Sequence, residues 1–470
     1  MQRSTLIPLI VACALFMEHM DSTVIATSLP AIAADLGENP LALKLALTAY
    51  LVALAVFIPV SGWVADRYGS RTVFAWAIGV FMLGSLLSGA SGSLEGFVGA
   101  RFLQGIGGAM MVPVGRLVLL RAIPKSELVA ALNLLTIPAM IAPLLGPPIG
   151  GLITQAAHWR WIFLINLPIG ALGLFLVLKH IPNVRETDNP PLDLPGFALS
   201  SFGLSVLMLG VSTLGGHLLA RSVSLGCLAA GALVLAFYVR HALRAAHPVL
   251  DLSLLRQPGF LNGVAAGGMF RVGLGSLAFL LPLMLQLGFG MSPFDSGMVI
   301  CASAAGVMVM KTATVWVLKR YGFRRVLVTN CMIAGGSFAL CGLFSASTPY
   351  WVMVGVLFAS GCLRSLQFTA LNAITFAEVH GKQMSRATSF SGMAQRLAQS
   401  VGIAIGAYIL EIVSALHGHA GLQASDFPPA FFAMALISCT AVLVHARMPE
   451  GVGAEMSGHH VRGKAPGAGS

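Results

Sequence analysis

The chain has 470 residues, of which 57% are hydrophobic and 10% are charged, and its mean hydropathy is +0.85. Water-soluble domains carry about 25% charged residues, so this composition excludes a soluble fold. The formal net charge is +11, but the basic residues stand singly between apolar runs, without the basic stripe of a nucleic-acid-binding surface. We therefore expect an integral membrane protein that contacts the lipid bilayer and has no nucleic acid partner.

A membrane-spanning helix needs about 20 mostly apolar residues, and the sequence contains fourteen such runs. In chain order they cover residues 6–28, 45–65, 72–92, 95–119, 128–155, 159–181, 194–214, 222–240, 259–285, 294–318, 324–346, 349–376, 386–416 and 427–446. Polar breaks at 182–192 and 244–258 separate them into groups of six, two and six. The pattern predicts an all-α integral membrane protein with fourteen transmembrane helices.

The distribution of Lys and Arg tests this count independently, because cytoplasmic loops are rich in basic residues. With fourteen spans, nineteen basic residues fall on one side and three, Lys44, Arg160 and Arg221, on the other. A miscount by one helix would destroy this alternation. We expect a multi-pass membrane protein with both termini in the cytoplasm.

An internal repeat supports two equivalent six-helix halves. The segment Trp63–Arg71 follows the second predicted helix, Trp316–Arg324 follows the second helix of the last group, and six of nine positions are identical. Such repeats are typical of secondary transporters. We expect an N-terminal six-helix bundle at 1–181, a linker with two additional helices at 182–258, a C-terminal bundle at 259–448 and a polar cytoplasmic tail at 449–470.

Five motifs resemble those of the major facilitator superfamily, specifically its fourteen-helix drug:proton antiporter branch. They are Gly62–Arg71, Met20–Pro30, Arg101–Gly105, Gly146–Gly151 and Trp159–Pro168. The sequence departs from the branch at three positions, Ala26, Ser70 and Ala142. The resemblance implies the major facilitator fold and proton-coupled antiport that exports small molecules or drugs across the bacterial inner membrane. We expect no cofactor, no bound metal and no obligate protein partner.

The loop motif suits a conformational latch, with Gly62, Asp66, Arg67, Gly69 and Arg71 as its residues. We expect Gly62 to permit close approach of helices and Gly69 to permit a tight turn. Asp66 is expected to pair with Arg67, with Arg71 or with a helix N-terminus. The alternative is simple solvation of a short basic loop, which the duplicated motif disfavours.

The fifth predicted helix carries a second motif, whose residues Gly146, Pro147, Gly150 and Gly151 give it a kink and a face of small residues. Small residues let helix backbones approach closely, and proline removes a backbone hydrogen bond. We expect this antiporter motif to form a tight seal on the periplasmic half of the central cavity. Ordinary helix packing is the alternative.

Ionisable groups inside a membrane are costly and are therefore candidates for function. Glu18 and Asp21 are three residues apart and share a face of the first helix, and Arg101 lies in the fourth predicted span. Desolvation favours a protonated carboxyl group, whereas a nearby arginine favours the ionised form. We predict a proton-coupling site at Glu18, Asp21 and Arg101, the alternative being that one acid only solvates the end of its helix.

The C-terminal half has the opposite charge balance, because its predicted spans hold Arg271, Lys311, Arg364 and Arg396 against one acid, Glu411. An excess of cations suits an anionic substrate, whereas an exporter of lipophilic cations would be expected to show an excess of acids. Lys311 could alternatively extend to the cytoplasmic interface. We therefore keep an exporter of a small anionic metabolite, such as a carboxylate or metal–carboxylate complex, as the second hypothesis.

The predicted substrate-binding residues come from both halves: Gln104, Arg271, Lys311, Arg364, Gln367 and Arg396. We expect them to face a site at mid-membrane, which rocking of the two halves exposes alternately to each side. A membrane enzyme is disfavoured, because the sequence has no zinc-binding HExxH motif, no P-loop and no soluble catalytic domain. The substrate is therefore expected to be a small molecule that is moved and not transformed.

Overall fold

A computed structural model of the chain describes residues 3–124, 127–186, 191–215, 219–379, 383–418, 421–449 and 452. The expected tail at 449–470 therefore lies outside the described residues, apart from two positions. In the N-terminal half the long helices are α1 (Arg3–Leu36), α2 (Lys44–Tyr68), α3 (Ser70–Ala90), α4 (Leu94–Ala122) and α5 (Leu128–Ala156). The sixth span consists of α6 (Trp161–Leu164) and α7 (Asn166–His180).

Two further helices, α8 (Leu194–Thr213) and α9 (Arg221–Ala242), form a hairpin before the C-terminal half. That half comprises α10 (Pro258–Leu283), α11 (Pro293–Tyr321), α12 (Phe323–Gly342), α13 (Tyr350–Phe376), α14 (Met384–His417) and α15 (Phe427–His445). Helix α10 continues into a short π-helical turn, Met284–Gly288. The described elements are all helical, as the sequence predicts.

Thirteen helical segments of the described chain are long and apolar enough to cross a membrane, with α6 and α7 counted together. Helix α5 brings the number to fourteen, because its 29 residues contain no charged side chain. The predicted count is therefore confirmed. Helix α1 ends at Leu36, eight residues beyond the predicted end at 28, because Leu29, Ile32 and Ala33 continue its buried stripe and Pro30 is accommodated within the helix.

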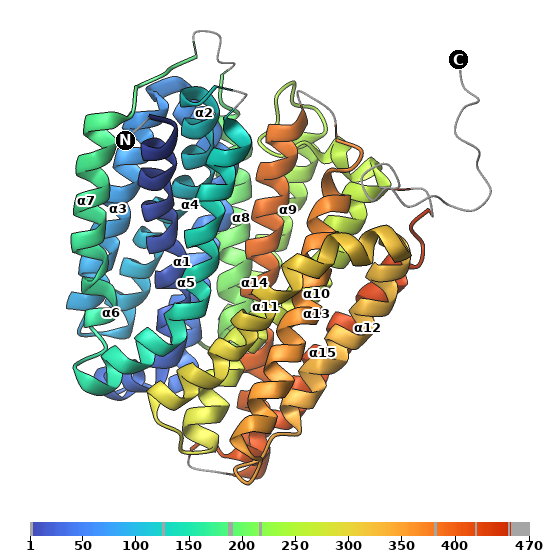
Figure 1. Cartoon of the computed structure of the whole chain (residues 1–470). Helices are drawn as coiled ribbons and strands as arrows, with labels where there is room; N and C mark the ends of the chain where they lie inside the picture. Colours follow the sequence, from blue (N-terminus) through green and yellow to red (C-terminus); the bar gives the residue numbers. More distant parts are fainter. Residues whose placement is uncertain are drawn as a thin grey trace.

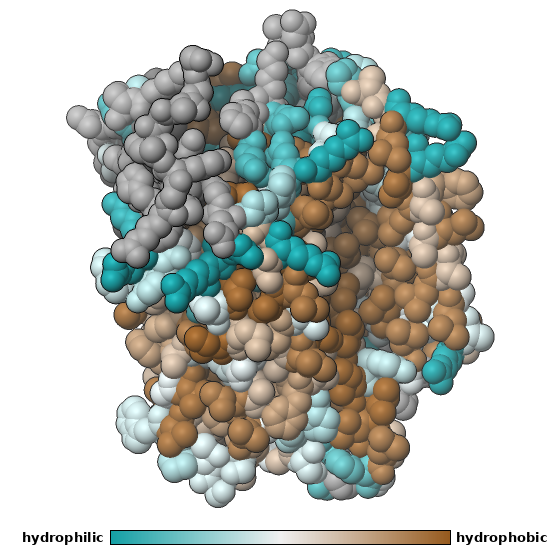
Figure 2. Space-filling view, turned by 90° about the vertical axis from the view of Figure 1, so that its right-hand side faces the viewer, coloured by the Kyte–Doolittle hydropathy of each residue, from teal (hydrophilic) through white to brown (hydrophobic). Residues whose placement is uncertain are grey.

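The two halves stand side by side, and the start of α1 and the end of α15 lie at the same face of the bundle (Figure 1). We call this the termini face and the opposite one the far face. The α8–α9 hairpin packs on α2 and α14, beside the junction of the halves. Figure 2 shows apolar side chains across the middle of one side, with hydrophilic side chains gathered mainly toward the termini face. This is the surface that a bilayer requires.

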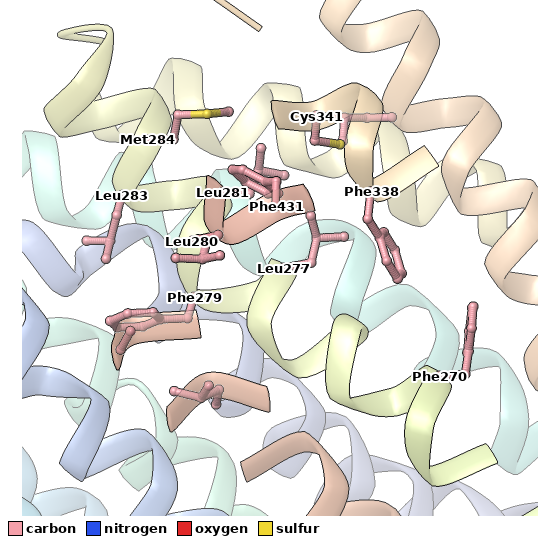
Figure 3. Close-up of a cluster of buried hydrophobic side chains, with 14 of the residues drawn as sticks. Phe270, Leu277, Phe279, Leu280, Leu281, Leu283, Met284, Phe338, Cys341 and Phe431 are labelled. Atoms are coloured by element: carbon pink, nitrogen blue, oxygen red, sulfur yellow. The ribbon is translucent and has the colours of Figure 1, made fainter. Parts of the chain in front are cut away.

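One apolar core lies within the N-terminal half, and a larger one fills the C-terminal half and continues into the N-terminal half through Phe97 and Trp159. In the C-terminal half, Phe270 and Leu277 of α10 pack with Phe338 of α12 and Phe431 of α15 (Figure 3). The Phe270 and Phe338 rings lie 5.9 Å apart. Packed cores deform little, so we expect the contacts within each half to be kept during any relative motion of the halves.

Two pairs of helices make most of the contact between the halves, α5 with α11 and α2 with α14, and α1 adds smaller contacts with α10 and α11. At the far face α5 and α11 touch through backbone: a Cβ added at Gly151 would lie 2.2 Å from the Pro293 carbonyl oxygen. A Cβ added at Gly297 of α11 would lie 2.3 Å from the carbonyl oxygen of Pro147. Both contacts require glycine, and they close the bundle near the ends of these helices.

Candidate functional site

Asp21 of α1 is the centre of a buried polar network in the N-terminal half. Arg101 Nη1 donates to Asp21 Oδ2 at 2.6 Å, and the side-chain amides of Gln104 and Asn166 donate to Oδ1 at 2.8 and 3.0 Å. Asp21 is 3% exposed and Arg101 is 1% exposed. A buried ion pair is stabilised when further hydrogen bonds satisfy its partners; the network does so for the Asp21 carboxylate, whereas Arg101 Nε is buried without a hydrogen bond.

Further contacts fix the donors around Asp21. Asn166 also donates to Ser85 Oγ at 2.9 Å, and Ser85 Oγ donates to the Phe163 carbonyl at 2.9 Å. The Arg101 guanidinium lies 4.4 Å from the centre of the Tyr50 ring. Helices α1, α2, α3, α4 and α7 therefore converge on a single carboxylate.

Glu18 occupies a second buried position on α1, one turn nearer the termini face, and it faces the other half. The Tyr50 hydroxyl donates to Glu18 Oε1 at 3.3 Å, and Arg396 Nη2 of α14 lies 3.6 Å from the same oxygen. His19 Nδ1 lies 2.5 Å from Oε2. Tyr50 thus links the two acids, since its ring stacks under Arg101 while its hydroxyl contacts Glu18.

A second ion pair crosses between the halves at the far face. Lys44 Nζ, at the start of α2, lies 2.5 Å from Glu411 Oε1 of α14, and the two side chains are 2% and 9% exposed. Gly215, in the turn between α8 and α9, covers the other carboxylate oxygen, because an added Cβ there would collide with it. The Gln286 side-chain amide also donates to the Thr27 carbonyl at 2.9 Å, from the C-terminal half to α1.

The antiporter motif of α5 has two contact faces. Gly146 and Gly150 lie against α1, where an added Cβ would meet Thr23 and the Val24 carbonyl. Pro147 and Gly151 instead face α11 across the junction described above. The motif therefore packs α5 against α1 of its own half and against α11 of the other half at the far face.

The loop motif is paired differently from the prediction. Asp66 Oδ1 accepts from Arg121 Nη2 of α4 at 2.6 Å, so the expected partners Arg67 and Arg71 were wrong. Arg121 also lies 2.9 Å from Glu186 Oε1 in the segment after α7. The motif alone could not reveal this partner, because Arg121 is 55 residues away in the sequence.

The two glycines of the loop motif behave differently. Gly69 adopts φ +96°, and a Cβ there would collide with Asn183, so the expected tight turn is confirmed. A Cβ at Gly62 would meet nothing within 4 Å, so the predicted close approach of helices at that position was wrong. In the second copy Gly322 has φ +74°. The duplicated motif thus produces the same backbone turn in both halves.

The cations of the C-terminal half lie in separate places. Arg271 is 2% exposed, donates to the Gly263 carbonyl at 3.4 Å and to Asn372 Oδ1 at 3.2 Å, and lies 5.3 Å from the Phe368 ring. Its Nε and that of Arg364 are buried without a hydrogen bond. Within the described residues neither arginine forms an ion pair, since Glu411 is bound to Lys44. Lys311 is exposed on α11.

Gln367 lies in a buried hydrogen-bond network of its own half. Its Oε1 accepts from Asn330 at 2.9 Å, and its Nε2 lies 3.2 Å from His445 Nε2. His445 Nδ1 lies 2.8 Å from Asn262 Oδ1. Its predicted role in substrate binding stays a prediction, but the observed contacts are those of a packing residue. The network joins α10, α12, α13 and α15, which correspond by order to α1, α3, α4 and α7 around Asp21.

Sequence reasoning missed several residues of these sites. Asn166 belongs to the sixth-helix motif, and its amide inside a predicted span was a usable signal. Tyr50, a lone phenol among apolar residues, was a weaker one. Lys44 was assigned to a loop, and its burial against Glu411 had no signal in the local pattern.

Comparison with known proteins agrees with this architecture. The Major Facilitator Superfamily model matches residues 11–274 and again 263–455. Relatives in Escherichia coli and Shigella boydii, each named "Putative multidrug resistance protein MdtD", are 36% identical over 446 residues, which is 94% of this chain and 94% of theirs.

Among solved structures, two are POT family transporters, one in complex with a thioalcohol-conjugated peptide and one with 5-aminolevulinic acid. They superpose with TM-scores of 0.69 and 0.68 at 16% and 15% identity, covering 93% of this chain and 94% of each. At such identity the likeness concerns the fold alone. The family match, the relatives and the fourteen helices together place this chain in the major facilitator superfamily of membrane transporters.

Proposed function

We propose that this protein is a proton-driven antiporter that exports small molecules or drugs across the inner membrane. The observation that carries the proposal is the buried Asp21–Arg101 network, which holds an ionisable pair inside a membrane-spanning half. The relatives named for multidrug resistance support export as the direction of transport.

Asp21 is suited to carry the proton because the arginine that donates to its carboxylate keeps other contacts when the carboxylate is protonated. When Asp21 takes up a proton, Arg101 loses its counter-charge but keeps the Gln104 Oε1 contact at 2.6 Å and the Tyr50 ring. The shift of Arg101 would be transmitted through Tyr50 to Glu18. Glu18 in turn faces Arg396 of the other half, so protonation in one half would alter attraction between the halves.

The transport cycle alternates between a state in which the far face is closed and a state in which the termini face is closed. The Lys44–Glu411 pair and the glycine contacts of α5 and α11 close the far face. We assign the termini face to the cytoplasm, since it carries most of the loop Lys and Arg residues. In this state the substrate would enter from the cytoplasm, and breaking the far-face contacts would release it on the other side.

An anionic substrate is the second candidate, and Arg271 favours it. A cation at bilayer depth costs at least about 2.5–3.5 kcal/mol on insertion scales. The two hydrogen bonds described for Arg271 are both longer than 3 Å. A transported anion could supply the missing counter-charge for part of the cycle. The variant Arg271→Gln should then weaken binding of organic anions at least tenfold while leaving neutral and cationic compounds unaffected. Unchanged affinity for every anion tested would remove this candidate.

Reconstitution tests the proposed function directly. Purified protein in liposomes with an imposed pH gradient should drive uphill movement of at least one compound from a panel of lipophilic cations, neutral drugs and organic anions. Dissipating the gradient with a protonophore should abolish accumulation. Accumulation that depends on another ion gradient, with none on the proton gradient, would contradict the proposal.

A further inference from the structure

A cavity of about 360 Å³ lies between α11, α13 and the start of α12, apart from the Asp21 and Glu18 sites. Its polar lining comes from two lysines, Lys311 and Lys319, and two threonines, Thr314 and Thr369. Apolar side chains, among them Phe323, complete the wall. The volume falls in the range of small-molecule sites, which join a largely apolar lining to a few placed polar groups.

The two lysines lie at different depths along α11. Lys319 is two residues from the end of the helix at Tyr321, whereas Lys311 is ten residues from it, or about 15 Å at 1.5 Å per residue. Lys311 is therefore well inside the hydrocarbon region, whose half-thickness is about 15 Å. In the part of the chain that the structure describes, no carboxylate pairs with Lys311. Its ammonium group, which is exposed on α11, is therefore accessible to the anionic group of a ligand.

We propose that this cavity binds an amphiphilic anion, with its carboxylate or phosphate group on Lys311 and Lys319 and its chain along the apolar wall. Thr314 and Thr369 supply hydroxyl groups that can donate to the same head group. An amphiphile fits better than a small hydrophilic anion, because most of the lining could not replace the water that such an ion would lose. The ligand could be a membrane lipid or a transported amphiphile.

Binding can be measured without any gradient, so a failure of proton-driven transport would count against the proposed function alone. Isothermal titration of the full-length protein in a non-ionic detergent would compare three probes: dodecyl phosphate, methyl phosphate and dodecyltrimethylammonium. We expect dodecyl phosphate to bind, methyl phosphate not to bind, and any binding of dodecyltrimethylammonium to be unaffected by Lys311→Gln. Lys311→Gln should weaken its affinity by about tenfold or more, as expected when a charged hydrogen-bond donor is lost.

The matched control is Arg320→Gln, since Arg320 is an exposed neighbour on α11 that does not line the cavity. It should leave the affinity unchanged. Equal affinity of the wild type and Lys311→Gln for dodecyl phosphate would overturn the site. Equal binding of methyl phosphate and dodecyl phosphate would overturn the inference that the ligand is an amphiphile.

Two further arms separate the sources of the ligand. A lipid ligand predicts that an anionic phospholipid copurifies with the wild type, is lost from Lys311→Gln and is retained by Asp21→Asn. A transported ligand predicts gradient-driven movement of labelled dodecyl phosphate that Asp21→Asn abolishes. Either result supports the cavity as an anion site and identifies what occupies it.

Discussion

The Lys44–Glu411 pair offers the sharpest test of how the far face is held closed. In Glu411→Gln the side chain keeps its size but Lys44 remains buried without a counter-charge. Breaking a buried pair on one side costs about 3–5 kcal/mol. At about 1.4 kcal/mol per factor of ten, the equilibrium between closed and open far face should shift roughly 150-fold to several thousand-fold toward the open state.

The double variant Lys44→Met/Glu411→Leu should not open the far face. Replacement of a buried ion pair by apolar residues is often neutral or stabilising, so the far face should stay closed. Asp35→Asn is the matched control, because the Asp35–Arg160 pair lies at the same face but is about one third exposed on each side. Such exposed pairs contribute about 0–1 kcal/mol.

Hydrogen exchange followed by mass spectrometry reports the closure at the start of α2 and the end of α14. Exchange there should rise strongly in Glu411→Gln and remain near the wild-type level in the double variant and in Asp35→Asn. If Glu411→Gln exchanged like the wild type, or if the double variant opened as much as the single one, the pair would not be what closes this face.

Two other predictions concern packing. Gly151→Leu should abolish transport while the protein still folds, because any side chain there meets the Pro293 carbonyl across the halves; normal transport rates in liposomes would refute this contact. His445→Leu leaves Asn262 Oδ1 without its partner and Gln367 Nε2 with only the Leu327 carbonyl at 3.4 Å, and an unsatisfied buried group costs about 1–3 kcal/mol. Its thermal unfolding temperature in detergent should therefore fall by several degrees, and an unchanged temperature would contradict the network.

The sequence predicted the spans and the repeat well because both depend on local properties. Fourteen apolar runs are long enough to cross a bilayer, and the positive φ of Gly69 and Gly322 follows from a short turn that recurs. The extension of α1 to Leu36 was missed because Pro30 looks like a helix end, although buried neighbours on both sides maintain the helix there.

Pairings between helices were not predictable in the same way. Asp21 and Arg101 were assigned to one site because both are costly inside a membrane, and they meet across 80 residues. The same reasoning counted Glu411 as the one acid among the cations of the C-terminal half, whereas it binds Lys44 of the N-terminal half, 367 residues away. Periodicity shows that a residue is on a buried face, but which helix covers that face depends on tertiary packing.

The central claim, coupling of transport to a proton on Asp21, is tested most directly with Asp21→Asn in liposomes. The substitution keeps the size of the side chain and removes its titration. It should abolish uphill accumulation driven by a pH gradient, while exchange of labelled for unlabelled substrate at equal concentrations continues at a measurable rate. Uphill accumulation by Asp21→Asn at the wild-type level would place the coupling proton elsewhere and contradict the account.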